Sequence, residues 1–249
     1  MEPRAEPRAG LREPLLAFAA ATAIAALLAA IGIAVPLVRD NLHGLIAIVF
    51  FYTPSVAARL GGRDFDYREV GLRVEPIKLN LAVVGALSAL TFPAFIAGFF
   101  LFYGHVCGGT ASGLARFWAP LCQRWLGASG GHLHLPPRFW LLALSQLVVV
   151  AIPEELFFRG YLMERLEKVW PPTRRLFGAP VGLALLASSA LFALGHLLVI
   201  PNPQRLAVFF PALVFGWMRA RTGSIAAGAV FHALCNIVAD VMHTSWFGP

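Results

Sequence analysis

The chain has 249 residues, of which 58% are hydrophobic and 13% are charged, and its mean hydropathy is +0.71. Soluble domains carry about 25% charged residues, so this composition excludes an ordinary soluble domain and indicates a membrane protein. The formal net charge of +7 could suggest a nucleic-acid-binding protein, but the basic residues are scattered over short connections. They are better explained as signals that orient membrane helices, and we expect no nucleic-acid partner.

The first 14 residues contain the sequence EPRA twice and are predicted to form a disordered, basic, cytoplasmic tail. The apolar stretch 15–38 is too long for the core of a signal peptide and lacks a convincing cleavage site, so we expect a retained membrane helix. Further apolar segments predict an all-α fold, a multi-pass bundle of about seven transmembrane helices, with six to eight possible. We expect one transmembrane domain over residues 15–249, with a catalytic core at about 139–242. The further segments are 44–58, 79–103, 139–158, 181–200, 206–218 and 224–241.

Seven helices with a cytoplasmic N-terminus divide the basic residues unevenly between the two sides of the membrane. Fifteen of the 20 Lys and Arg residues fall on the cytoplasmic side. This excess follows the positive-inside rule, and the Ala-, Arg- and Leu-rich composition is typical of a bacterial cell membrane protein. The same arrangement predicts that Glu154–Arg159 lies near the cytoplasmic end of the fourth helix. The five basic residues on the other side are Arg39, Arg116, Arg124, Arg138 and Arg205.

The connection 104–137 contains two of the three cysteines, Cys107 and Cys122. They could form a disulfide if this connection is extracytoplasmic, or they could remain free thiols. A structural zinc site with neighbouring histidines is also possible, although the spacing fits no standard pattern. Apolar side chains at helical spacing predict a short interfacial helix, with a packed surface helix as the alternative. The histidines are His105, His132 and His134, and the apolar side chains are Leu114, Phe117, Trp118, Leu121 and Trp125.

Only three acids lie within or beside the apolar spans: Glu154, Glu155 and Asp240. A charge inside hydrocarbon costs roughly 2.5–3.5 kcal/mol, so such residues usually have a function. Glu155 and Arg159 are four residues apart on one helix face and are suited to an ion pair, whereas Glu154 points about 140° away from Arg159. Pro153 removes a backbone donor and is expected to kink this helix. The alternative is that these charges only end the helix at the interface.

Two later spans each carry a polar pair one helical turn apart. Phe192 and His196 share a face, and Gly195 is expected to let another backbone approach closely. His232 and Asn236 share a face of the last span. Each pair alone could be structural, as a hydrogen-bonded core histidine or as a polar link between helices.

Together these side chains have the complementary chemistry of a hydrolase. A partly desolvated glutamate such as Glu154 can act as general base to a water molecule, and His196 can share that water or protonate a leaving amine. His232 and Asn236 can stabilise an oxyanion, an effect worth roughly 3–4 kcal/mol per donor.

These three motifs resemble those of the CAAX-protease and bacteriocin-processing (CPBP) family, which includes the Rce1-like and Abi proteins. Its members are glutamic-type intramembrane endopeptidases. The matching residues are Glu154–Arg159 for EExxxR, Phe192–His196 for FxxxH and His232–Asn236 for HxxxN, the last preceded by Arg221–Ser224. The resemblance implies that Glu154 and His196 activate the water and that His232 and Asn236 bind the oxyanion. Glu155 and Arg159 would support them, and Phe192 would shape the pocket.

The resemblance implies an endopeptidase that cleaves near the C-terminus of a membrane-associated protein or peptide. The substrate could be a prenylated CAAX tail or a C-terminal sorting signal, as in the myxosortase-like branch that the region 50–72 resembles. The alternative class is a non-catalytic membrane protein, such as a transporter, proton relay or scaffold, that uses the same polar residues. A zinc enzyme with Glu154, His196 and His232 as ligands is also possible, but the chain has no HExxH sequence, and we expect no cofactor.

Overall fold

In the computed structural model, the described residues are 10–107, 122 and 133–247. Most of the predicted N-terminal tail and nearly all of the predicted interfacial helix at 114–125 lie outside them. Helix α1 begins at Arg12, so the predicted tail is too long at its C-terminal end. The reason is that Glu13 is held by side chains of other segments, which orders the first turn of the helix.

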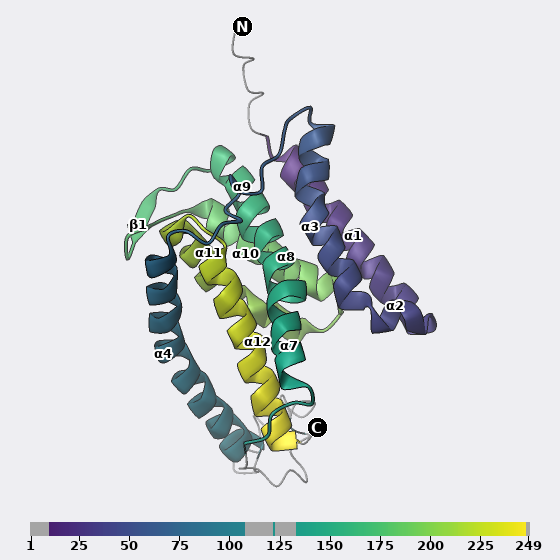
Figure 1. The fold of residues 1–249 in the computed structure, drawn as a ribbon, viewed down its shortest axis with the longest axis vertical. Helices are drawn as coiled ribbons and strands as arrows, with labels where there is room; N and C mark the ends of the chain where they lie inside the picture. Colours follow the sequence, from purple (N-terminus) through teal and green to yellow (C-terminus); the bar gives the residue numbers. More distant parts are fainter. Residues whose placement is uncertain (1–9, 108–121, 123–132, 248–249) are drawn as a thin grey trace, which may run out of the picture.

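The described chain is almost entirely helical, which confirms the predicted all-α membrane bundle (Figure 1). Each of the seven predicted spans forms a helix. Within the described ranges, five helical segments are long and apolar enough to cross a membrane, while two others are shorter. The five are α1 (Arg12–Ala34), α3 (Leu42–Leu60), α4 (Ile77–Leu101), the continuous segment Phe139–Val169 and α12 (Ala226–Phe247). The shorter two are α10 (Leu183–Val199) and α11 (Phe209–Thr222).

The segment Phe139–Val169, here called the rod, combines α-helical and π-helical stretches. Pro153 has no N–H for the preceding turn, and the residues before it adopt the wider π-helical form. The helix was predicted to end at about residue 158, which is wrong, because it continues past Gly160 to Val169 and ends shortly before Pro171. Glu154 therefore lies near the middle of the rod. The charged residues Glu154, Glu155 and Arg159 do not mark a helix end. The stretches are α7 (Phe139–Ser145), η2 (Gln146–Ala151), α8 (Ile152–Glu155), η3 (Leu156–Leu162) and α9 (Met163–Val169).

The rod and α12 form the centre of the bundle (Figure 1). The hairpin of α1 and α3, joined through α2 (Pro36–Asp40), packs on one side of the rod, and α4 packs against α12. Helices α10 and α11 pack together, joined by the 3-10 helix η4 (Pro203–Val208). The three central elements that carry the predicted motifs, namely the rod, α10 and α12, therefore meet inside one bundle.

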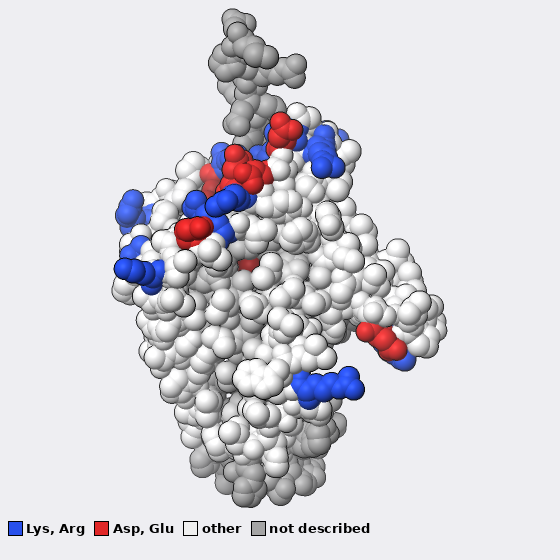
Figure 2. Space-filling view, in the orientation of Figure 1, with Lys and Arg blue, Asp and Glu red and all other residues white. Residues whose placement is uncertain are grey.

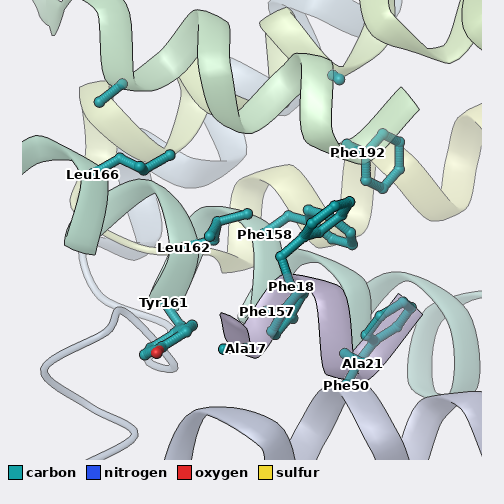
Figure 3. Close-up of a cluster of buried hydrophobic side chains, with 12 residues drawn as sticks. Ala17, Phe18, Ala21, Phe50, Phe157, Phe158, Tyr161, Leu162, Leu166 and Phe192 are labelled. Atoms are coloured by element: carbon teal, nitrogen blue, oxygen red, sulfur yellow. The ribbon is translucent and has the colours of Figure 1, made fainter. Parts of the chain in front are cut away.

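A cluster of buried aromatic side chains joins the rod to its neighbours (Figure 3). Phe50 of α3 stacks on Phe157 with the ring centroids 5.2 Å apart, and Phe158 meets Phe192 of α10 edge to face at 4.9 Å. Phe18 of α1 contacts Phe158 from another side. Such aromatic pairs contribute about 0.5–1.5 kcal/mol each beyond their buried area, so this cluster fixes η3 between α1, α3 and α10.

Charged side chains gather at one end of the molecule (Figure 2). This basic end comprises the start of α1, residues 59–78, α9, the β-hairpin and the end of α11. Glu13 accepts a hydrogen bond from Tyr161 at 3.0 Å and forms ion pairs with Arg63 and Arg165. The hairpin pairs β1 (Arg174–Leu176) with β2 (Ala179–Val181) in antiparallel register. Its two-residue turn has positive φ at both residues, Phe177 and Gly178.

The opposite end contains the start of the rod, α2, the end of α12 and the π-helical η1 (Phe102–Cys107) that continues α4. Cys107 is joined to Cys122 by a disulfide, so the alternative of two free thiols is wrong. A zinc site with Cys107 or Cys122 as thiolate ligand is also wrong, because both sulfur atoms are consumed by this bond. His132 lies outside the described residues.

Candidate active site

The structure brings Glu154 of the rod, His196 of α10 and His232 of α12 together. Glu154 Oε2 lies 4.0 Å from His196 Nε2 and 3.8 Å from His232 Nε2. Both separations are too long for a direct hydrogen bond. Among the described residues Glu154 Oε2 is buried and has no hydrogen-bond partner, so this carboxylate oxygen is placed between two imidazoles without being bonded to either.

Glu155 has a different environment, although it is the next residue. Its side chain is completely buried, and its Oε1 lies 3.1 Å from Arg159 Nη1, which confirms the predicted ion pair geometry. His232 Nδ1 also donates to Glu155 Oε1, at 3.0 Å. This second contact was not predicted, because it joins residues 77 positions apart and no spacing rule reveals it.

Arg159 is buried among aromatic rings. Its guanidinium carbon lies 4.2 Å from the ring centroid of Phe192 and 5.3 Å from that of Phe215. Its Nη2 donates to the backbone carbonyl of Ala212 at 3.4 Å. Arg159 therefore stabilises Glu155 through an ion pair, and cation–π contacts hold its guanidinium in place.

The two histidines are oriented by hydrogen bonds at Nδ1. His196 Nδ1 lies 3.0 Å from the carbonyl oxygen of Phe192, and a carbonyl only accepts, so Nδ1 carries the hydrogen. His232 Nδ1 donates to Glu155 in the same way. Phe192 packs on the His196 ring at 4.4 Å and Phe215 stacks on the His232 ring at 4.8 Å. Both imidazoles thus present Nε2 to the same carboxylate.

Asn236 belongs to a network of hydrogen-bonded side chains, and only part of this network was predicted. Its Nδ2 donates to Gln146 Oε1 at 2.9 Å, and Gln146 Nε2 donates to Asp240 Oδ2 at 3.2 Å. Asp240 was noted as an acid in an apolar span, and it lies one turn beyond Asn236. Gln146 was missed, although a glutamine inside the apolar run of the fourth span was a visible signal. These hydrogen bonds fix the direction of the Asn236 amide.

A cavity of about 770 Å³ is lined by Glu154, His196, His232 and Asn236. Most of the other lining side chains are apolar and come from α3, the rod, α10 and α12. Ligand pockets are commonly about 300–1,000 Å³ and mostly apolar with a few polar groups, so this cavity can hold a peptide segment.

Gly195 of α10 and Gly228 of α12 lie where other side chains pack close to the helix backbone. A Cβ at Gly195 would meet only side chains, the nearest atom being 3.6 Å away on Phe18, so the expected close backbone approach at Gly195 is wrong. A Cβ at Gly228 of α12 would lie 3.2 Å from Glu155 Oε2. Gly228 therefore allows α12 to pack against Glu155, one turn before His232.

The residues Arg221–Ser224 include the end of α11 and the start of the turn that leads to α12. Gly223 ends α11 with φ of 72°, a left-handed conformation that favours glycine. Ser224 Oγ accepts from the backbone N–H of Ala226 at 3.0 Å and so caps the start of α12. This turn positions the helix that carries His232 and Asn236.

The described part of the chain contains no group of three or more His, Cys, Asp or Glu residues arranged to hold a metal ion. Glu154, His196 and His232 are therefore not assembled as a preformed metal site. The absence of a cofactor remains a prediction.

Residues 136–238 match the family model described as type II CAAX prenyl endopeptidase, Rce1-like. The matched segment contains all three motifs and agrees with the resemblance to the CPBP family. No curated protein and no solved structure matches the chain.

Proposed function

We propose that the chain is a glutamic-type intramembrane endopeptidase of the Rce1-like family of type II CAAX prenyl endopeptidases, whose family model residues 136–238 match. The proposal is supported above all by one observation. A buried carboxylate oxygen of Glu154 has no hydrogen-bond partner among the described residues and faces two imidazole Nε2 atoms inside a cavity.

The first step is activation of a water molecule by Glu154 and His196. Glu154 Oε2 and His196 Nε2 are both acceptors and lie 4.0 Å apart. A water molecule that donates one hydrogen to each, over about 2.8 Å, fits this separation and leaves a lone pair for attack. Glu154 then takes a proton as the water oxygen bonds to the substrate carbonyl carbon.

The second step is stabilisation of the oxyanion by Asn236 and His232. Asn236 Nδ2 carries two hydrogens, of which Gln146 uses one, so the other is available to the oxyanion. His232 can donate from Nε2 when it is doubly protonated, and this form balances the buried charges of Glu154, Glu155 and Arg159. The proton held by Glu154 passes to the leaving amine, directly or through His196, as the C–N bond breaks.

The substrate we propose is a membrane-associated protein or peptide that is cleaved near its C-terminus. A prenylated tail and a C-terminal sorting signal are the two candidates. We propose a multi-pass protein of the bacterial cell membrane with its N-terminus in the cytoplasm, and a catalytic core at 139–242.

The test of this function is a comparison of C-terminal peptides from membrane proteins in two strains. One strain makes the wild-type chain and the other makes the Glu154→Ala variant at the same level. We expect a set of proteins to keep longer C-termini in the variant strain. Identical C-termini in both strains, together with no cleavage by the purified wild type, would favour the non-catalytic alternative.

We propose that catalysis requires no metal ion. The wild-type enzyme is expected to keep full activity in a strong chelator, with no zinc found by elemental analysis. Loss of activity that added zinc restores would contradict this proposal and indicate Glu154, His196 and His232 as ligands.

A further inference from the structure

The catalytic cavity extends from Glu154 toward the end of the molecule that lies opposite the basic end. Its lining includes Pro137 and Arg138 before the rod, Leu42 and His43 at the start of α3, and Ile200 just after α10. All these positions lie on the same side of Glu154. Helices α10 and α11 are short, and the chain turns back between them at residues 200–208, where Ile200, Arg205 and Val208 line the cavity.

Toward the basic end, the cavity is closed by packed side chains. Every rod residue from Glu155 to Met163 is buried, and Phe157, Phe158, Tyr161 and Leu162 expose 1% or less of their surface. Figure 3 shows these side chains packed with Phe18, Phe50 and Phe192. No rod residue beyond Phe158 lines the cavity. The site is therefore sealed from the basic end by the aromatic cluster.

Two independent features assign the ends to compartments. Lys and Arg concentrate at the basic end, which the positive-inside rule assigns to the cytoplasm (Figure 2). The Cys107–Cys122 disulfide lies at the opposite end, and disulfides persist in oxidising, extracytoplasmic compartments. Of the basic residues described, only Arg39, Arg138 and Arg205 belong to that end.

We infer that the active site is entered from the extracytoplasmic side of the membrane. The substrate class, resting on the proposed function, is a membrane-anchored polypeptide whose cleavage segment has been exported. Leu42, Ile46, Leu141 and Leu142 give the cavity an apolar wall that suits a segment drawn from the bilayer. A tail presented in the cytoplasm meets the sealed end. The position of Glu154 at the middle of the rod contradicts the expectation of a site near the cytoplasmic end of its helix.

Thiol labelling of the full chain tests the direction of entry without requiring a substrate. Ser145→Cys places a thiol on the cavity wall, and Arg175→Cys places one on the exposed β-hairpin at the basic end. Both variants are made with Cys235→Ala, because Cys235 is the free cysteine in the described chain and lines the same cavity. A sulfonated, membrane-impermeant maleimide is added to spheroplasts of a bacterial host or to inverted membrane vesicles.

We expect the Ser145→Cys variant to react at least tenfold faster in spheroplasts than in inverted vesicles, and the Arg175→Cys variant to show the reverse. Labelling of Ser145→Cys from the cytoplasmic side would overturn the inference. Labelling from neither side would overturn it too, since the cavity would then be closed. Labelling from outside in a chain that cleaves no membrane protein would retain the direction of entry and reject the protease function.

Discussion

Glu154 and Glu155 are adjacent in the chain but have opposite surroundings. Glu155 is neutralised by Arg159 and receives a hydrogen bond from His232, whereas Glu154 has a buried oxygen without a described hydrogen-bond partner. Helical geometry alone predicted this division, because only Glu155 shares a face with Arg159. The His232 contact adds a hydrogen bond that joins Glu155 to the proposed oxyanion site.

The Glu155–Arg159 pair can be tested by a double-mutant cycle. Arg159→Leu leaves a buried carboxylate without its guanidinium, and breaking a buried ion pair costs about 3–5 kcal/mol. We expect a large decrease in the unfolding temperature in detergent. Glu155→Leu combined with Arg159→Leu should unfold at a higher temperature than Arg159→Leu alone. A double variant that is less stable than the single one would contradict the pairing.

Gln146 is predicted to act as a positioning residue for Asn236. Gln146→Ala removes the acceptor that orients the Asn236 amide, so we expect about a tenfold decrease in kcat with little change in KM. Asn236→Ala removes the proposed oxyanion donor itself, and loss of one such donor costs about 10²–10³ in kcat.

The double variant Gln146→Ala, Asn236→Ala should match Asn236→Ala alone, because the two residues act through one interaction. Leu144→Ala is the control for a neighbouring change on the exposed face of the rod, outside the cavity, and should leave kcat unchanged. Fully additive losses would contradict a positioning role.

At the scale of elements, the rod departs most from what its sequence predicted. Its existence, its apolar face and the irregularity at Pro153 were predictable from composition and from the missing backbone donor. Its extension to Val169 was not, since the charges at Arg159 and beyond resemble a helix end at the membrane interface. Burial by α1, α3 and α10 keeps that stretch helical and inside the bundle.

Gly160 and Gly195 form a matched pair that tests this packing. A Cβ at Gly160 would lie 2.7 Å from the backbone carbonyl oxygen of Val70, so Gly160→Ala requires a shift of the backbone. We expect a loss of about 1–3 kcal/mol of stability, measured by unfolding in detergent.

Gly195→Ala places its Cβ no closer than 3.6 Å to any neighbouring atom outside its own helix backbone, and alanine favours a helix by up to about 1 kcal/mol over glycine. This variant should be as stable as the wild type or more so. Equal losses in both variants would show that η3 does not pack on the 70–71 loop.

For the whole molecule, the sequence predicted the class of fold, the seven apolar spans that form its longer helices, and the three motifs. Local spacing identified the faces of Glu154, His196 and His232, because each motif lies within one or two helical turns. Contacts between distant residues, such as His232 with Glu155 and Asn236 with Gln146, depend on how the helices pack and could not be read from spacing. The direction of the cavity depends on the turn between α10 and α11 and was likewise hidden.

The arrangement of the helices predicts that the two ends of the chain lie on opposite sides of the membrane. Helix α1 begins at the basic end and α12 ends at the opposite end (Figure 1). A reporter that fluoresces only when it folds in the cytoplasm should be bright when fused to the N-terminus. The same reporter should be dark at the C-terminus, with equal amounts of both fusions in the membrane. Bright fluorescence from both would contradict this topology.

The central claim, that Glu154 activates water, is tested most directly by the cleavage rate of purified Glu154→Gln. Glutamine keeps the size of the side chain but cannot act as general base, a role worth about 10²–10⁴ in rate. The control is Glu164→Gln, which changes an acid of α9 whose ion-pair partners are Arg165 and Lys168, away from the cavity. The account predicts a loss of at least about 100-fold in kcat for Glu154→Gln, with unfolding unchanged, and full activity for Glu164→Gln. Cleavage by Glu154→Gln within about tenfold of the wild type would contradict it.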